Sequence, residues 1–287
     1  MKHYLKLMRV HHYIKNLLIF TPLIFGGLFF SSDLLLLTVI GFISFSLVAS
    51  SIYIINDIQD VEADRLHPTK KSRPLAMNAI SITNAKILFV MLLLIVIGLQ
   101  IVFFNDSIWP LVVLVTYFIL NILYSNGLKH YPIIDISILV SGFVLRVLYG
   151  SSITSIEISN WLYLTVLMMS FYLALGKRRN ELKRQNSTSR KVLQYYNQDF
   201  LDKNMYMCLA LTIGFYSLWT VDPVTILRLS NEYLVWTVPI VILICMKYSL
   251  NIERDSDGDP VEVIMKDKIV LSLIVAFMCV CMAIIYL

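Results

Sequence analysis

Nine apolar runs follow one another along the chain, and they restrict its fold more than any other feature. The runs cover approximately residues 17–30, 34–55, 85–104, 108–124, 133–149, 161–175, 205–221, 233–250 and 269–287. A helix needs about 20 apolar residues to cross a bilayer, so the shorter runs are expected to extend into flanking polar residues. Hydrophobic residues make up 58% of the chain and the mean hydropathy is +0.74, which excludes an ordinary soluble domain. We therefore predict an all-α, polytopic membrane protein with nine transmembrane helices in a single domain, residues 1–287.

The distribution of Lys and Arg predicts the orientation of these helices. The connections after the second, fourth, sixth and eighth runs are charged, whereas Arg228 is the only basic residue in those after the first, third, fifth and seventh. Loops rich in Lys and Arg remain in the cytoplasm. We therefore expect a cytoplasmic N-terminus, an extracytoplasmic C-terminus and a multi-pass location in the cell (plasma or inner) membrane. The first run contains Pro22 and Gly26, so we expect it to be kinked, or interfacial at its start.

A stretch of charged residues follows the second run directly. Asp57, Asp60 and Asp64 are spaced i, i+3 and i+7, so on a helix at about 100° per residue they fall within roughly 60° of one another. Three carboxylates on one face repel each other and need a cation. Mg²⁺ takes oxygen ligands and commonly bridges one or two carboxylates to substrate phosphates. The alternative is a solvated cytoplasmic loop between two membrane helices.

Basic residues continue this stretch and suit the phosphate oxygens that a metal does not reach. They are Arg65, Lys70, Lys71 and Arg73. A second polar region runs from Tyr124 to Asp135 and leads into the fifth apolar run, which contains Arg146. Asp135 and Arg146 are three helical turns apart and lie on nearly one face, so they form either part of a functional site or an ion pair that orients helices.

Two further charged regions lie after the sixth and eighth runs. The first, residues 176–184, includes Lys177 and Arg178 and suits phosphate, anionic lipid headgroups or topology alone. The second, residues 254–262, is acidic and lacks the spacing of a calcium loop. It is either a tight turn or a lid over the polar pocket.

Taken together, these residues resemble the UbiA superfamily of intramembrane prenyltransferases. Asn56-Asp57-x-x-Asp60-x-x-x-Asp64 matches the first acidic motif of that superfamily, and nine spans match its architecture. The resemblance extends over the whole chain. It implies a UbiA-like helical bundle with a polar pocket open to the cytoplasm, in which Mg²⁺ holds a diphosphate, and a lateral apolar tunnel for a lipid tail.

The second motif departs from the aromatic-prenylating branch of the superfamily, which has paired aspartates there. This chain offers only Asp135, and its other motifs resemble the decaprenyl-phosphate phosphoribosyltransferase branch. They are residues 14–16, 67–74, 128–135, 142–150 and 177–181. The resemblance implies that phosphoribosyl pyrophosphate donates its 5-phosphoribosyl group to a polyprenyl (decaprenyl-type) phosphate with release of diphosphate. The product would enter lipid-linked sugar precursors of the cell envelope.

The resemblance also assigns roles to residues. Catalytic roles fall to Asp57, Asp60, Asp64 and Arg146, and Mg²⁺ binding falls to Asn56, Asp57 and Asp60. Substrate binding falls to Lys15, Asn56, Lys70, Arg73, Tyr124, Lys129, Asp135, Lys177 and Arg178.

Two alternatives remain open. One is transfer of a prenyl chain from its diphosphate to an aromatic quinone precursor, which predicts a second aspartate pair near Asp135. The other is a membrane transporter or divalent-cation channel, which predicts carboxylates at mid-membrane and often internal repeats. The expected partners are the two substrates and the bilayer, without nucleic acid. A homo-oligomer is among the assemblies that the sequence leaves open.

Overall fold

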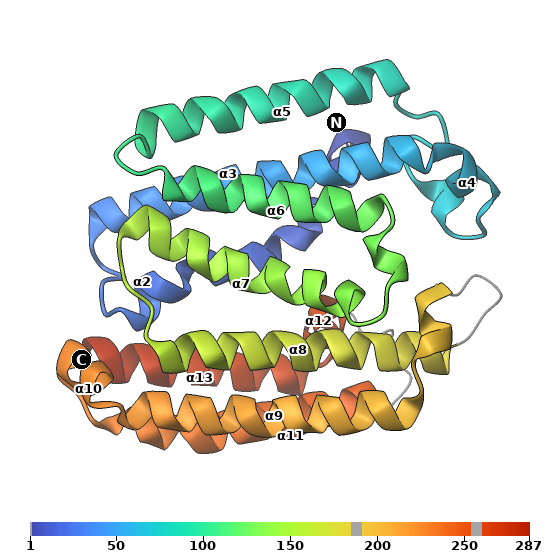
Figure 1. Ribbon diagram of the computed structural model, residues 1–287. Coiled ribbons are helices and arrows are strands. Elements are labelled where there is room, and N and C mark those ends of the chain that lie inside the picture. The colour runs from blue at the N-terminus through green and yellow to red at the C-terminus, as the bar shows by residue number, and fades with distance from the viewer. Residues whose placement is uncertain (1, 185–190, 254–259) are drawn as a thin grey trace. The chain divides into compact units, whose positions relative to one another are not determined.

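The computed structural model describes residues 2–184, 191–253 and 260–287, and every regular element within these ranges is a helix (Figure 1). The predicted all-α class is thereby confirmed. The chain forms two compact units. The first unit comprises Met1–Phe20, Ser31–Asn126 and Leu145–Ser155, and the second comprises Thr21–Phe30, Gly127–Val144 and Ile156–Leu287.

The first unit is built around the long helix α3. Its elements are α1 (Lys2–Met8), η1 (Val10–Phe20), α3 (Ser32–Gln59), α4 (Val61–Leu66), η2 (Lys70–Ser72), α5 (Ile82–Phe103), α6 (Trp109–Ser125) and the part of α7 (Ile134–Thr154) from Leu145 onward. Helix α3 packs against α5, η1, α1 and α6. Small residues on α3 allow this close packing, as in many membrane bundles. A Cβ at Gly41 would lie 2.4 Å from Cδ1 of Ile153 on α7.

The second unit is a set of helices packed around α8 and α9. Its elements are α2 (Thr21–Phe25), η3 (Leu128–His130), the first part of α7, α8 (Asn160–Lys183), η4 (Lys191–Tyr195), α9 (Gln198–Val221), α10 (Pro223–Leu229), η5 (Tyr233–Thr237), α11 (Val238–Glu253), α12 (Pro260–Lys266) and α13 (Lys268–Tyr286). Helices α8 and α9 lie side by side (Figure 1). The core between these helices includes Tyr172, Leu201 and Met205, each with none of its surface exposed.

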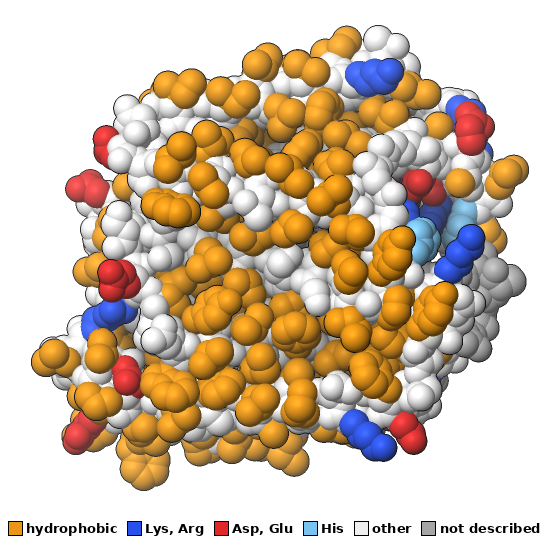
Figure 2. All heavy atoms as spheres, viewed as in Figure 1, with side chains coloured by type: hydrophobic (Ala, Val, Ile, Leu, Met, Phe, Trp, Pro, Cys, Tyr) orange, Lys and Arg blue, Asp and Glu red, His pale blue; other side chains and the backbone are white. Residues whose placement is uncertain are grey.

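Several helices are long and apolar enough to cross a membrane. Five described segments qualify: Ser32–Gln59, Ile82–Phe103, Ile134–Thr154, Tyr233–Glu253 and Lys268–Tyr286. A sixth qualifies if α9 and α10, bent by 56° at their junction, form one span. On the face drawn in Figure 2, hydrophobic side chains cover much of the helices and charged side chains lie mostly near helix ends. The protein is a multi-pass membrane protein.

These five or six helices are fewer than the nine predicted spans, for local physical reasons. Helix α6 has only 17 residues. Helix α8 ends in the charged sequence Lys177–Lys183, which lowers its hydropathy. The first apolar run divides into η1, α2 and a turn at Gly27, whose φ of +77° favours glycine. The expected irregularity of this run is therefore present.

Candidate functional site

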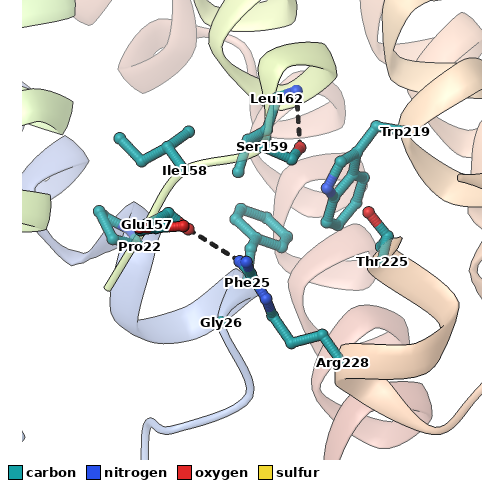
Figure 3. Close-up of a pocket in the computed structure, with 10 residues that line it drawn as sticks. All are labelled: Pro22, Phe25, Gly26, Glu157, Ile158, Ser159, Leu162, Trp219, Thr225 and Arg228. Carbon is teal, nitrogen blue, oxygen red and sulfur yellow. Dashed lines mark hydrogen bonds between the residues drawn. The ribbon is translucent and has the colours of Figure 1, made fainter. Parts of the chain in front are cut away.

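A small cavity in the second unit does not have the size of a substrate site. It lies beside α2 and the start of α10, between Phe25, Trp219 and Arg228 (Figure 3). Arg228 Nη1 donates a hydrogen bond of 2.8 Å to the carbonyl oxygen of Glu157 at its edge. The cavity volume of about 10 Å³ has room for about one water molecule. The polar clusters of the described residues are therefore the candidates for the functional site.

The acidic motif lies where α3 ends and α4 begins. Helix α3 ends at Gln59, and Asp60 is both the C-cap of α3 and the N-cap of α4. The motif therefore does not lie on one unbroken helix, although the backbone N–H groups of Asp60 and Asp64 still donate to the carbonyl oxygens of Asn56 and Asp60. Asp57 and Asp64 are buried, with 2% and 3% of their surface exposed, whereas Asp60 is exposed. Solvent therefore reaches Asp60 but hardly reaches the other two carboxylates.

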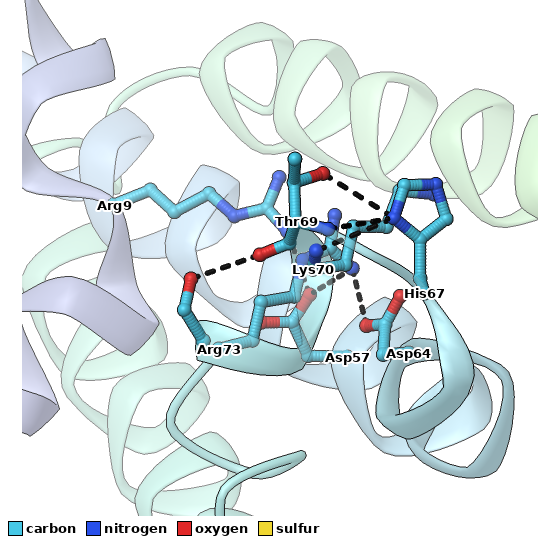
Figure 4. Close-up of polar contacts among 8 residues, drawn as sticks. Arg9, Asp57, Asp64, His67, Thr69, Lys70 and Arg73 are labelled. Atoms are coloured by element: carbon cyan, nitrogen blue, oxygen red, sulfur yellow. Dashed lines mark hydrogen bonds and ion pairs between the residues drawn. The ribbon is translucent and has the colours of Figure 1, made fainter. Parts of the chain in front are cut away.

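Two arginines pair with these buried carboxylates, and the four residues Arg9, Asp57, Asp64 and Arg73 form the Arg73 cluster (Figure 4). Nη1 of Arg73 lies 3.1 Å from Oδ1 of Asp57 and 2.6 Å from Oδ2 of Asp64. Nη2 of Arg9 donates to Oδ1 of Asp57 at 2.6 Å. Charge-assisted hydrogen bonds of this length are stronger than neutral ones. The cluster therefore joins the N-terminal segment, the end of α3 and the loop after α4.

Local contacts shape the loop that presents Arg73. The Nδ1 atom of His67 lies 3.3 Å from both the backbone nitrogen and the hydroxyl of Thr69, which begins the turn η2. Nζ of Lys6 donates to the carbonyl oxygen of Ser72 at 2.8 Å. Lys70 lies in the same turn with an exposed side chain. The loop thus places the guanidinium of Arg73 against the two carboxylates, whereas the side chain of Lys70 is exposed.

The oxygen atoms around the junction of α3 and α4 are of the type that binds Mg²⁺. Oδ1 of Asn56 is buried and accepts no hydrogen bond from any described residue. The arginines engage one oxygen each of Asp57 and Asp64, and the second oxygen of each has no partner in the described part of the chain. Among the same residues, no three His, Cys, Asp or Glu side chains form a metal site by themselves. The protein donors thus suit an ion completed by phosphate oxygens.

Arg146 lies in a second polar cluster of the first unit. It is 7% exposed, and its Nε donates to Oδ1 of Asn16 at 2.7 Å while Nη2 lies 3.2 Å from the hydroxyl of Tyr117. Its guanidinium also faces the rings of Phe45 and Tyr117 at 5.0 and 5.1 Å. Lys15 precedes Asn16 on η1 and is half-buried. Tyr124, near the end of α6, is half-buried as well.

Asp135 lies in the second unit, in a cluster with Arg178, Glu181 and Tyr196 that we call the Asp135 cluster. Oδ2 of Asp135 accepts from Nε of Arg178 at 2.5 Å, and Oδ1 accepts from the Tyr196 hydroxyl at 2.6 Å. Arg178 also donates to Oε2 of Glu181 at 2.6 Å. Asp135 and Arg178 have no exposed surface. Burial, followed by the hydrogen bond to Asp135, raises the pKa of Tyr196, which keeps its hydroxyl protonated.

These contacts replace the ion pair between Asp135 and Arg146 that the sequence left open. Each of the two residues instead has its own set of partners. Lys129 lies on η3 and Lys177 on α8, both half-buried in the second unit. Residues 254–259 of the acidic segment 254–262 lie outside the described residues. The expected turn or lid therefore stays a prediction.

The partners in these clusters that were not predicted as site residues include Arg9, Asn16 and Tyr196. Arg9 stands among the basic residues before the first apolar run, and Asn16 follows Lys15 in a family motif. Tyr196 has no comparable signal, because it contacts a carboxylate 61 positions earlier in the chain. Local spacing therefore points toward the first two only.

Comparison with known proteins identifies the family. The model of the UbiA prenyltransferase family matches residues 18–266. The chain is 33% identical to decaprenyl-phosphate phosphoribosyltransferase from Corynebacterium glutamicum over 98% of this chain and 86% of that protein. It is also 33% identical to the protein of that name from Mycolicibacterium smegmatis, over 95% of this chain and 89% of that protein.

Solved structures show the same fold. A UbiA homologue from Archaeoglobus fulgidus bound to GPP and Mg²⁺ matches with a TM-score of 0.69 and 19% identity, over 98% of this chain and 99% of that one. A digeranylgeranylglyceryl phosphate synthase matches with a TM-score of 0.65 and 20% identity, over 98% of each chain. The family match covers most of the chain, and the fold agrees with it. This protein is a transferase of the UbiA prenyltransferase family.

Proposed function

We propose that this membrane enzyme transfers the 5-phosphoribosyl group of phosphoribosyl pyrophosphate to a polyprenyl phosphate. The observation that carries the proposal is the state of Asp135. It is a single carboxylate, and both of its oxygens are engaged, by Arg178 and by Tyr196. A second pair of carboxylates, expected for the aromatic-prenylating branch, is not formed there among the described residues. The names of the relatives at 33% identity support the same branch.

The reaction is a substitution at the anomeric carbon of the ribose. The bond from C1 to the diphosphate oxygen breaks, and a bond from C1 to an oxygen of the lipid phosphate forms. The electron pair of the broken bond leaves with the diphosphate. The attacking phosphate oxygen is already anionic at neutral pH, so no general base is required. Positioning and charge stabilisation then supply the catalysis.

The Arg73 cluster is suited to the diphosphate end of the donor. In this proposal Asn56, Asp57 and Asp60 hold Mg²⁺, and Asp64 binds either the metal or the ribose hydroxyls. When bound, the ion neutralises negative charge that grows on the leaving group. The proposed ligands of substrate phosphate are Lys15, Lys70, Arg73, Lys129 and Arg146, with Lys177 and Arg178 as further candidates. Tyr124 and Asp135 complete the proposed substrate-binding set.

We also propose that the chain crosses the membrane nine times. Nine spans arise if the segment η1–α2, the short helix α6 and the apolar part of α8 cross the membrane beside the six spans already counted. The charge distribution then places the N-terminus and the Arg73 cluster on the cytoplasmic side of the cell membrane. A soluble sugar phosphate donor would reach the cluster from that side.

The test uses purified protein in detergent or lipid with Mg²⁺, and it offers two substrate pairs. The first is phosphoribosyl pyrophosphate with decaprenyl or undecaprenyl phosphate, and the second is a prenyl diphosphate with an aromatic acceptor. We expect diphosphate release only with the first pair, and only when Mg²⁺ is present. Consumption of the second pair alone would overturn the proposal in favour of aromatic prenylation. Turnover of neither pair would also contradict it.

A further inference from the structure

Tyr196 forms two hydrogen bonds through one hydroxyl, and both reach the start of α7. The hydroxyl accepts from the backbone N–H of Ile133 at 2.6 Å and donates to Oδ1 of Asp135 at 2.6 Å. Only 7% of Tyr196 is exposed, and its ring stacks on Phe200 at an interplanar angle of 11°. The hydroxyl therefore ties the segment before α9 to the two residues around the first turn of α7.

The backbone bonded by Tyr196 is strained. Ile133 has a φ of +68°, and a β-branched residue in this left-handed region suffers a steric clash of its side chain with the backbone. Such conformations persist where surrounding contacts determine them, and they cluster at functional sites. The bond from Ile133 N–H to Tyr196 is a contact that opposes relaxation of this strain.

The strained residue closes a short segment that contains Lys129. Gly127 has a φ of +144° at its other end, a conformation that L residues rarely adopt. Between Gly127 and Ile133 the chain forms the single turn η3, which contacts η4. The side chains of Val192 and Leu193 on η4 are buried, with 0% and 2% exposed. Tyr196 therefore follows a firmly packed turn, which gives its hydroxyl a fixed position.

We propose that Tyr196 is a positioning residue, whose hydroxyl holds the segment from Gly127 to Ile133 in the geometry that lets Lys129 bind the phosphorylated donor. The inference rests on the proposed function for the part played by Lys129. Tyr196 itself takes no part in bond making or breaking. Its hydroxyl stays protonated because burial and the Asp135 carboxylate raise the pKa of Tyr196, so the bond to Asp135 persists at neutral pH.

The first test measures the segment itself and needs no enzymatic activity. Hydrogen–deuterium exchange is followed in peptides that cover residues 128–137 of the full chain in detergent. We expect Tyr196→Phe to exchange faster there than wild type, because the acceptor of the Ile133 N–H is lost. The matched control is Tyr195→Phe, since Tyr195 is 64% exposed and its hydroxyl has no partner among the described residues. Unchanged exchange in Tyr196→Phe would overturn the inference.

The second test separates positioning from simple stabilisation. We expect Tyr196→Phe to raise the KM for phosphoribosyl pyrophosphate about tenfold, because both hydrogen bonds of the hydroxyl are lost, with kcat within about twofold of wild type. Tyr195→Phe should leave both constants unchanged. Faster exchange with an unchanged KM would overturn the positioning role. A wild-type enzyme that transfers no phosphoribosyl group overturns the proposed function instead, and exchange alone then decides whether Tyr196 holds the segment.

A second substitution tests the strain directly. Ile133→Gly removes the steric clash at this φ. The geometry of the segment should then depend less on the hydrogen bond to the Tyr196 hydroxyl. In the Tyr196→Phe background, we expect Ile133→Gly to reverse part of the increase in KM. In the wild-type background, we expect it to change the KM little. Equal effects of Ile133→Gly in both backgrounds would contradict the link between the strain and the hydroxyl. If Tyr196→Phe lowers the yield of folded protein, the same comparison can be made on yield: Ile133→Gly should raise the yield in the Tyr196→Phe background and change it little in the wild-type background.

Discussion

Arg73 is the residue on which the polar cluster at the end of α3 depends. Its Nη1 reaches both Asp57 and Asp64, which are almost fully buried. Buried carboxylates without a cationic partner are unfavourable. Removal of the shared guanidinium leaves Asp57 with Arg9 alone and Asp64 without a cationic partner among the described residues. In the proposed reaction, an arginine in this position would also neutralise charge on the leaving diphosphate.

The first prediction concerns Arg73→Gln. We expect a loss of about 100-fold or more in kcat/KM, the usual consequence of removing a group that stabilises transition-state charge. The matched control is Arg65→Gln, because Arg65 is exposed and bonds Glu62 and Asn78 at the surface. Exposed ion pairs contribute little, so the control should keep nearly full activity. Initial rates of diphosphate release measure both, and equal rates in the two variants would refute the assignment.

The second prediction concerns the buried pair of Asp135 and Arg178. Arg178→Met leaves a buried carboxylate without its cation, so we expect destabilisation of about 3–5 kcal/mol. The double variant with Asp135→Asn removes the charge as well and should be more stable than Arg178→Met alone. Thermal unfolding in detergent, compared with the exposed control Arg228→Met, measures the order. A double variant less stable than the single one contradicts this account.

At the scale of single residues, the sequence predicts which residues are functional candidates better than it predicts the residues that contact them. The spacing of Asp57 and Asp64 marks them as functional candidates, but it does not pair them with Arg73. Arg9 contacts Asp57 across 48 positions of sequence, and Tyr196 contacts Asp135 across 61. Such pairings depend on the packing of separate elements, which spacing along the chain does not reveal.

At the scale of elements, α3 shows how small residues set the distance between helices. A Cβ on Gly41 would lie 2.4 Å from Cδ1 of Ile153 and 3.3 Å from Cε1 of Tyr149, both on the part of α7 in the first unit. Ser44 is fully buried one turn further along α3. A larger side chain at position 41 would force neighbouring side chains away from their favoured rotamers.

The third prediction follows from this contact. We expect Gly41→Leu to lower the stability of the protein by about 1–3 kcal/mol through overpacking. Gly98→Leu on α5 is the control, because a Cβ at Gly98 meets nothing within 4 Å. The apparent Tm in detergent should fall for Gly41→Leu and stay near wild type for Gly98→Leu. The opposite order would contradict the packing described for α3.

Apolar runs predicted the existence of the helices but not their ends. Helix α3 continues to Gln59, four residues beyond the end of its apolar run, and then breaks at Asp60. Helical periodicity alone extends through Asp64, so the break could not be expected from spacing. The segment η1–α2 departs further from the prediction. Pro22 and Gly27 interrupt an apolar run that would form one continuous helix by composition alone.

At the scale of the whole molecule, charge distribution is the basis of the proposed topology. The connection after the second run contains Lys70, Lys71 and Arg73, whereas the connection after the third run contains only Asp106 as a charged residue. Cytoplasmic connections of membrane proteins are enriched in Lys and Arg. The two connections should therefore face opposite sides of the membrane.

The fourth prediction tests this arrangement with cysteines at exposed positions. Lys71→Cys and Asp106→Cys are made in a Cys279→Ser background, since Cys279 is the exposed cysteine among the four. A membrane-impermeant maleimide applied to intact cells should label Asp106→Cys, and should label Lys71→Cys only after permeabilisation. The background alone serves as the control. Labelling of Lys71→Cys in intact cells would reverse the topology and place the Arg73 cluster outside.

The most direct measurement of the central claim is mass spectrometry of the lipid product. Purified wild type, Asp57→Asn and the control Asp33→Asn, at the opposite end of α3, are each incubated with Mg²⁺, phosphoribosyl pyrophosphate and decaprenyl phosphate. We predict a phosphoribosylated lipid phosphate with wild type and Asp33→Asn, and none with Asp57→Asn. An unmodified lipid with wild type, or full product with Asp57→Asn, would contradict the account.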